Sequence, residues 1–259
     1  MTIPIYQVDA FTDRRFGGNP AAVCPLERWL EDELLQSIAA ENNLSETAFF
    51  VREGGRHRLR WFTPAVEVDL CGHATLASAY VILERLAPHL ECVAFDTRSG
   101  ELLVRRAGDL LEMDFPAVRA KPVEDGGLVA EGLGRAPREV WAARDFLAVY
   151  ESEDDVRALA PDMTKVAALD RFAVIATAPG RDCDFVSRFF APAKGVPEDP
   201  VTGSAHCTLA PYWGERLGKR ELRARQVSKR GGEILCGLAG DRVKLRGRAV
   251  MYLEGSISV

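Results

Sequence analysis

The stretch that decides the fold runs from Phe62-Thr63-Pro64-Ala65 to Cys71-Gly72-His73-Ala74-Thr75, and it has a counterpart later in the chain. The counterpart runs from Phe190-Ala191-Pro192-Ala193 to Asp199-Pro200-Val201-Thr202-Gly203-Ser204-Ala205. After each copy an apolar run leads to Glu-Arg-Leu, at the same distance from the glycine in both. One α/β unit is therefore predicted to occur twice, as two similar lobes that face each other across a cleft with the chemistry between them.

Size and charge exclude several classes of protein. The chain has 259 residues, 47% of them hydrophobic, which is enough for one large or two ordinary domains with a sizeable core. The formal net charge of −5 argues against a protein that binds nucleic-acid phosphates. The densest basic stretch, Arg56–Arg60, is interpreted as one face of a strand or its turn.

The N-terminus and the cysteines indicate a compartment. Residues Met1–Ile5 lack the basic region and long apolar run of a signal peptide, and the longest apolar run, Phe172–Ala178, is too short to span a membrane. The six cysteines include no CxxC pair and no zinc-ligand spacing. We therefore expect a soluble cytoplasmic protein without disulfides or metal, and without a nucleic-acid or membrane partner.

Hydrophobic periodicity predicts the elements that carry the repeat. Glu31–Asn42 has apolar residues on one helical face, so a helix is expected there. Two further helices are predicted at about 73–86 and about 204–217, each following a glycine. Strands are predicted over much of the remaining chain, and the Pro- and Gly-rich segment 116–137 is expected to cross between the lobes.

The glycines before these two helices suggest a ligand site. A helix N-terminus has unpaired backbone N–H groups and about half a positive charge, and a glycine lets a ligand approach the backbone closely. Gly72 and Gly203 could together hold an anion, most simply a small carboxylate. Each glycine could instead only allow a sharp turn. Because the pattern is repeated and a polar residue follows each glycine, we favour the ligand.

Two titratable residues are candidates for acid/base chemistry. Glu46 stands between a predicted helix and the apolar strand Thr47–Val51, where partial burial suits a general acid or base. It could also only pair with an arginine. His73 can titrate near neutral pH or donate a hydrogen bond, or it can simply cap its helix.

Other polar residues beside the turns have structural alternatives as well. Asp199 is a polar residue of the second repeat, although an Asp-Pro pair often starts a turn. Ser204 can cap the second helix or bind a substrate. Cys71, just before a helix, is a candidate thiolate or a small buried residue. Asn19 follows two glycines and is expected to line the cleft.

Four motifs in this order resemble the PhzF-like (phenazine biosynthesis-like) isomerase family over the whole chain: Phe16–Val23, Asn43–Phe49, Cys71–Thr75 and Ser187–His206. The resemblance implies the α+β diaminopimelate-epimerase fold, with two pseudosymmetric lobes that each wrap a β-barrel-like sheet around a central helix. It implies an N-terminal lobe of residues 1–117, joined by a last strand at about 250–259, and a C-terminal lobe of residues 118–249.

The resemblance also implies a reaction. Glu46 matches the family's proton-shuttling glutamate, and its supporting polar residues are matched by His73, Asp199 and Ser204. Contacts with the substrate are expected from Gly72, Gly203, Asn19 and Cys71. Family members use no cofactor or metal and are often homodimers. The leading hypothesis is therefore a cofactor-free isomerase, present as a homodimer, that moves a proton within a small carboxylate.

Departures from two relatives leave other hypotheses open. Cys71 fits the first of the two facing thiols that the related epimerases use, but Asp199–Val201 occupies the region of the second. Two-thiol racemisation is therefore not supported. Cys71 also replaces a small residue of the phenazine enzyme, so phenazine synthesis is not assumed. An amino-acid epimerase or racemase with Cys71 as one base, and a non-catalytic protein that binds small carboxylates, stay as alternatives.

Overall fold

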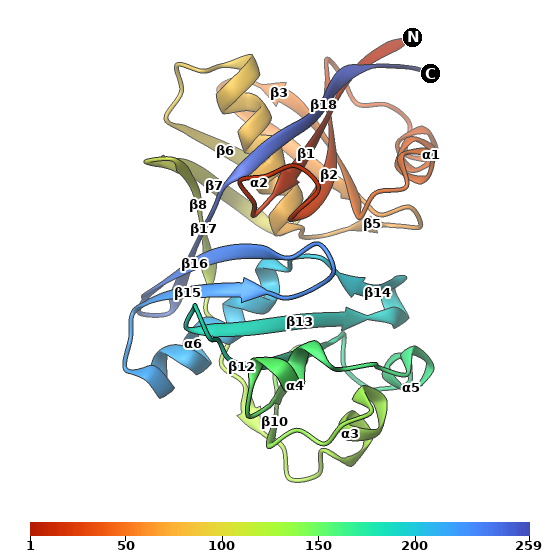
Figure 1. Cartoon of the computed structure of the whole chain (residues 1–259). Coiled ribbons are helices and arrows are strands. Elements are labelled where there is room, and N and C mark those ends of the chain that lie inside the picture. Colours follow the sequence, from red (N-terminus) through yellow and green to blue (C-terminus); the bar gives the residue numbers. More distant parts are fainter. The chain divides into compact units, whose positions relative to one another are not determined.

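The computed structural model describes residues 1–259 and divides them into two compact units, and most of their elements are labelled in Figure 1. Unit 1 comprises Met1–Asp114 and Arg246–Val259, and unit 2 comprises Phe115–Leu245. Both units combine strands with few helices, which confirms the predicted α+β class. None of the helices has the length and apolar composition that a membrane crossing needs.

The elements of unit 1 are β1 (Thr2–Ala10), β2 (Asn19–Leu26), α1 (Asp32–Asn42), β3 (Glu46–Glu53), β4 (Arg56–Phe62), β5 (Glu67–Val68), α2 (Gly72–Val81), the π-helix η1 (Ile82–Leu86), β6 (Cys92–Thr97), β7 (Gly100–Ala107), β8 (Leu110–Pro116, which ends two residues into unit 2) and β18 (Ala249–Ser258). β1 pairs antiparallel with both β2 and β18, and β2 pairs parallel with β3. The parallel pair places Ala21 opposite Glu46.

Helix α2 is the central helix of unit 1. Eight of its ten residues are buried, and it packs against strands β1, β2, β3, β7 and β18. A helix buried on all sides must satisfy its hydroxyl groups internally. Oγ1 of Thr75 donates to the carbonyl of Cys71 at 2.6 Å, and Oγ of Ser78 donates to that of Ala74 at 2.7 Å. The predicted helix at 73–86 is thus α-helical only to Val81 and continues as η1.

The elements of unit 2 are β9 (Lys121–Pro122), α3 (Gly127–Leu133), β10 (Glu139–Ala142), β11 (Phe146–Val149), α4 (Glu153–Arg157), α5 (Met163–Ala167), β12 (Val174–Pro179), β13 (Phe185–Ala191), the 3₁₀ helix η2 (Pro192–Lys194), β14 (Val196–Asp199), α6 (Gly203–Leu217), β15 (Glu221–Gln226), β16 (Gly232–Ala239) and β17 (Arg242–Gly247, which ends two residues into unit 1). Eleven of the fifteen residues of α6 are buried, and the helix packs against β15 and β16.

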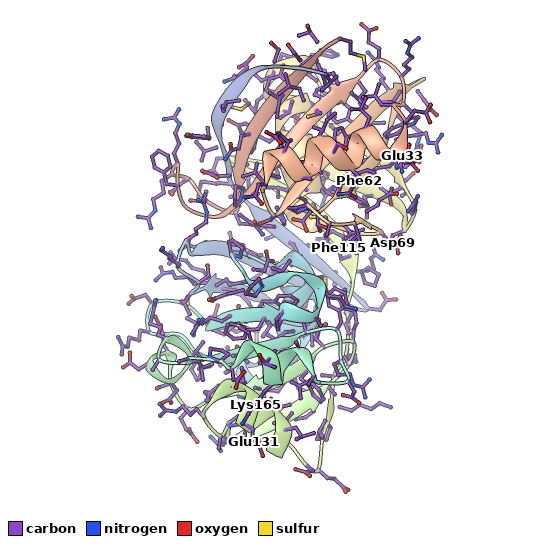
Figure 2. The ribbon with its side chains drawn as sticks, turned by 90° about the vertical axis from the view of Figure 1, so that its right-hand side faces the viewer. Glu33, Phe62, Asp69, Phe115, Glu131 and Lys165 are labelled. Carbon is purple, nitrogen blue, oxygen red and sulfur yellow. The ribbon has the colours of Figure 1, made fainter.

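Segment 116–137, expected to cross between the lobes, lies wholly within unit 2, because the chain passes from unit 1 to unit 2 between Asp114 and Phe115. The segment contains β9 and α3. Helices α4 and α5 have no periodic signal, because each is only five residues long. Side-chain caps start both of them, Ser152 in a capping box and Asp162. Glu131 on α3 and Lys165 on α5, labelled in Figure 2, form an ion pair at 3.6 Å.

Candidate active site

The chain turns back just before Glu46. Helix α1 ends at Asn42, and Asn43 adopts the left-handed conformation (φ 48°) that asparagine tolerates at helix ends. Strand β3 then starts at Glu46, and the following residue, Thr47, is already buried. The side chain of Glu46 is 14% exposed, so its carboxylate lies where the core meets solvent.

The start of α2 supplies Cys71 and His73. Cys71 is the N-cap, with extended backbone (φ −142°, ψ 108°), and its side chain makes no capping hydrogen bond. His73 lies in the first turn, and its side chain is 5% exposed. The alternative that His73 caps its helix is therefore wrong, because Cys71 occupies the cap position.

Three side chains of unit 1 converge on the ring of His73. Nδ2 of Asn19 lies 3.1 Å from Nδ1 of the ring, and Sγ of Cys71 lies 3.5 Å from the same nitrogen. Nε2 lies 3.0 Å from Oε2 of Glu46. This last contact does not have hydrogen-bond geometry, so the buried Oε2 has no hydrogen-bond partner in the structure. A buried carboxylate oxygen without a partner is rare enough to call for a functional explanation.

The amide of Asn19 determines which ring nitrogen carries a proton. An amide nitrogen can only donate, so with the amide oriented as in the structure Nδ1 of His73 is the acceptor. The proton of the neutral ring is therefore on Nε2, the nitrogen that faces Glu46.

Burial and charge fix the state of the thiol. Burial, aided by the negative charge of Glu46, raises the pKa of Cys71 to about 11, although His73 acts in the opposite direction. Cys71 is therefore a neutral thiol at pH 7. Burial lowers the pKa of His73, but the charges of Cys71 and Glu46 outweigh this and hold it well above 6.5. Because the thiol is neutral at pH 7, Glu46 supplies the charge that acts on His73 there.

The loop before β2 positions Asn19. Gly18 has a φ of +61°, and a Cβ on it would lie 2.1 Å from the carbonyl oxygen of Ala10, so only glycine fits. Oδ2 of Asp9 accepts the backbone N–H of Phe16 at 2.9 Å and holds the loop closed. Asn19 then begins β2 as a fully buried residue.

In unit 2 a short turn joins β14 to α6. Asp199 is the last residue of β14, and Thr202 is the N-cap of α6. The hydroxyl of Thr202 donates to Oδ2 of Asp199 instead of capping the helix. The alternative that Ser204 caps α6 is wrong as well, because Ser204 is the second residue inside the helix.

Gln226, which was not predicted from the sequence, lies in the core and forms hydrogen bonds with the backbone of this turn. It is fully buried at the end of β15. Its Nε2 donates to the carbonyl of Asp199 at 2.7 Å, and its Oε1 accepts the N–H of Thr202 at 2.9 Å. The one signal in the sequence is its phase, because Gln226 continues the inward-facing positions Leu222 and Ala224.

Arg144, also missed, contacts the predicted site residue Ser204. Its Nη2 donates to Oγ of Ser204 at 3.2 Å. Asp145, which is buried, orients the guanidinium through an Nε–Oδ1 contact of 3.1 Å. The guanidinium carbon also lies 4.4 Å from the centre of the Phe172 ring. An arginine in a loop gives no pattern that could have identified this contact.

The predicted site residues thus fall into two groups. The cluster in unit 1 contains Asn19, Glu46, Cys71 and His73, with Gly72 at the start of the same helix. The group in unit 2 contains Asp199, Gly203 and Ser204, which lie in one turn and the helix that follows it.

Comparisons with known proteins agree with this architecture. The family model for phenazine biosynthesis-like protein matches residues 8–255. A protein of Pseudomonas aeruginosa described as an uncharacterized isomerase is 54% identical over 257 residues, which cover 99% of each chain. The crystal structure of a PhzF-family phenazine biosynthesis protein from Enterococcus faecalis matches with a TM-score of 0.97 at 44% identity and covers 100% of both chains.

A more distant structure shows the extent of the fold. A hydroxyproline epimerase from Agrobacterium vitis matches with a TM-score of 0.62 at 12% identity, over 99% of this chain and 92% of its own. The fold and the relatives together define an isomerase with an epimerase-type fold. The chain belongs to the phenazine biosynthesis-like (PhzF-like) family, which confirms the resemblance drawn from its four motifs.

Proposed function

We propose that this isomerase moves a proton within a small carboxylate substrate, without a cofactor, and that Glu46 is its general acid and base. The observation that carries the proposal is the buried Oε2 of Glu46, which has no hydrogen-bond partner although Nε2 of His73 lies 3.0 Å away. Catalytic contacts are often poorly aligned in an empty site and improve when substrate binds.

In the proposed reaction the Glu46 carboxylate removes a proton from one carbon of the substrate and returns a proton to another. His73 is a positioning residue in this scheme. Its Nε2 lies 3.0 Å from Oε2, which leaves Oε1 to meet the substrate. When the ring is neutral, the Asn19 amide donates to Nδ1, which keeps the single ring proton on Nε2.

The charges in unit 2 support an anionic substrate. Ser204 lies in the first turn of α6, where backbone N–H groups carry a partial positive charge. Arg144 adds a full positive charge, and Lys194 lies 5.3 Å from the same Phe172 ring that Arg144 covers. We propose that Gly203, Ser204 and Arg144 bind the substrate carboxylate.

Asp199 is proposed to present a fixed acceptor to the substrate, because Thr202 and Gln226 hold its turn.

A homodimer remains a prediction from the family resemblance, and light scattering would test it.

The alternative of an epimerase that uses Cys71 as a base gains less support. A thiol base must ionise, but burial and the charge of Glu46 raise the pKa of Cys71 to about 11. At pH 7 only a small fraction of the residue is thiolate. Cys71 is better suited to a contact with the substrate or with His73 than to the removal of a proton.

The test is incubation of the protein with a metabolite pool in deuterated water. We expect wild type to incorporate deuterium into a small carboxylate, and Glu46→Gln to lose that incorporation while keeping the same unfolding transition. Glu33→Gln, an exposed glutamate on α1 labelled in Figure 2, is the control and should behave as wild type. Exchange by Glu46→Gln at the wild-type rate would refute the role of Glu46. Specific binding of a carboxylate without any exchange would favour the non-catalytic alternative.

A further inference from the structure

The cluster in unit 1 contains three different metal-ligating groups. A carboxylate oxygen of Glu46, the sulfur of Cys71 and a ring nitrogen of His73 all lie within 4.8 Å of one another. Sγ is 4.0 Å from Nε2, and Nε2 is 3.0 Å from Oε2. These contacts come from two elements, β3 and the start of α2, so the backbone fixes their spacing.

The spacing fits one ion. Zinc binds nitrogen and carboxylate oxygen at about 2.0–2.2 Å and thiolate sulfur at about 2.3 Å, so two of its ligand atoms are roughly 3–4 Å apart in a tetrahedral site. The 3.0 Å and 4.0 Å separations fall at the two ends of that range. A thiolate with an imidazole selects soft or borderline cations such as Zn²⁺ and Cd²⁺ over Mg²⁺ or Ca²⁺.

The charges are also suitable. Glu46 and the ionised Cys71 bring two negative charges to a divalent cation. The N-terminus of α2 opposes a cation with only about half a positive charge. The buried Oε2 of Glu46 has no hydrogen-bond partner, and an ion at this position would satisfy it.

We propose that Glu46, Cys71 and His73 form an inhibitory site for a thiophilic divalent cation, Zn²⁺ or Cd²⁺. When the metal–sulfur bond forms, the thiol proton of Cys71 leaves to solvent. The ring binds through Nε2, whose proton also leaves to solvent, while Nδ1 keeps a proton and donates it to Oδ1 of Asn19 after the amide turns. The ion then binds the carboxylate oxygen of Glu46 that lies next to His73. A fourth coordination position on the ion stays open.

Inhibition rests on the proposed role of Glu46, whereas binding of the ion does not. The two can therefore fail separately. If Cd²⁺ binds at Cys71 but leaves deuterium exchange unchanged, the inhibitory role is overturned. If Glu46→Gln exchanges deuterium like wild type while Cd²⁺ still binds, the proposed function fails and the metal site stands.

The experiment is titration of the substrate-free protein with Cd²⁺, followed by the thiolate-to-metal charge-transfer absorption and by calorimetry. We expect one ion per chain, and a loss of affinity of at least about 100-fold in Cys71→Ser and Cys71→Ala, since even outer-shell changes cost 10–100-fold. Glu46→Gln should weaken binding but keep the absorption band. The second cysteine variant guards against a folding defect in the first, and both are compared by thermal unfolding.

The matched control is Cys92→Ser, because Cys92 is the exposed thiol and the obvious place for adventitious binding. This variant should bind Cd²⁺ as wild type does. An unchanged absorption band in both Cys71 variants, or its loss in Cys92→Ser, would overturn the site.

Discussion

Two buried histidines lie in the first turns of α2 and α6, and their pKa values move in opposite directions. His73 faces Glu46, and the nearby negative charges raise its pKa well above 6.5 despite its burial. His206 has no exposed surface, and burial lowers its pKa to about 4. Its Nδ1 donates to the carbonyl of Thr202 at 2.8 Å, while its Nε2 has no partner.

The difference between these helix starts is instructive. Both place a histidine in a buried first turn, but only the start of α2 sets a carboxylate against the ring. In unit 2 the ring of His206 contacts the backbone carbonyl of Thr202 instead of a carboxylate. The same local architecture can therefore support proton transfer in one unit and fixed polar contacts in the other.

The largest effect on kcat is expected when the ring of His73 is replaced, and His206 is the matched comparison. His73→Phe removes the nitrogens that face Glu46 and Asn19, and we expect kcat to fall about 100-fold. His206→Asn keeps a donor for the carbonyl of Thr202, so we expect it to change kcat less than about twofold. Steady-state kinetics on the substrate found by deuterium exchange makes the comparison. Equal losses of kcat in the two variants would contradict the different roles of the two histidines.

Acid stability sharpens the same comparison. The folded-state pKa of His206 is lowered to about 4, so below its unfolded pKa of 6.5 the unfolded chain binds a proton that the folded chain refuses. Stability is therefore lost as pH falls from 6.5 to about 4, by about 3 kcal/mol from this group, with no further loss below that range.

Urea unfolding at several pH values measures this loss. We expect His206→Asn to lose less stability than wild type between pH 6.5 and pH 4. Because the two proteins share all other titrating groups, the difference between their slopes of unfolding free energy against pH isolates His206. Parallel slopes would show that the ring is not kept neutral by burial.

The turn before α6 should depend on Gln226. Gln226→Leu removes the hydrogen bonds that Gln226 makes with the N–H of Thr202 and the carbonyl of Asp199 in a buried place, and we expect a loss of about 2–3 kcal/mol in the free energy of unfolding. Gln36→Leu, which removes one half-buried bond to the carbonyl of Thr63 in unit 1, is the control and should cost less. Urea unfolding of both variants tests the order, and a larger loss in Gln36→Leu would contradict it.

The smallest effect is expected at Arg144. Arg144→Gln removes a positive charge beside Ser204, and we expect KM for the carboxylate substrate to rise about tenfold with a smaller change in kcat. Arg171→Gln removes a neighbouring cation that lies over Phe146 and should leave KM unchanged. If both variants raise KM equally, the general positive charge of this region, and not a specific contact of Arg144, explains the binding of the carboxylate.

The repeat around Gly72 and Gly203 predicted both long buried helices, because the two glycines mark their first residues. Glu46 and His73 were also found from sequence, since Glu46 precedes the apolar strand Thr47–Val51 and His73 directly follows Gly72. Their mutual contact could not be read from the chain, because it depends on the packing of α2 against β3.

Other parts of the site left little trace in the sequence. Arg144 reaches Ser204 from a loop sixty residues earlier, and no local pattern encodes such a contact. Gln226 could have been noticed as a polar residue at an inward position of β15. The continuation of α2 as a π-helix after Val81 was missed because helical periodicity alone does not distinguish the two windings.

The most direct test of the central claim is the rate at which Glu46→Gln exchanges substrate hydrogen with deuterated water, relative to wild type. We expect a reduction of at least about 100-fold, with Glu33→Gln unchanged and all three proteins equally folded. An exchange rate in Glu46→Gln within twofold of wild type would show that another group moves the proton.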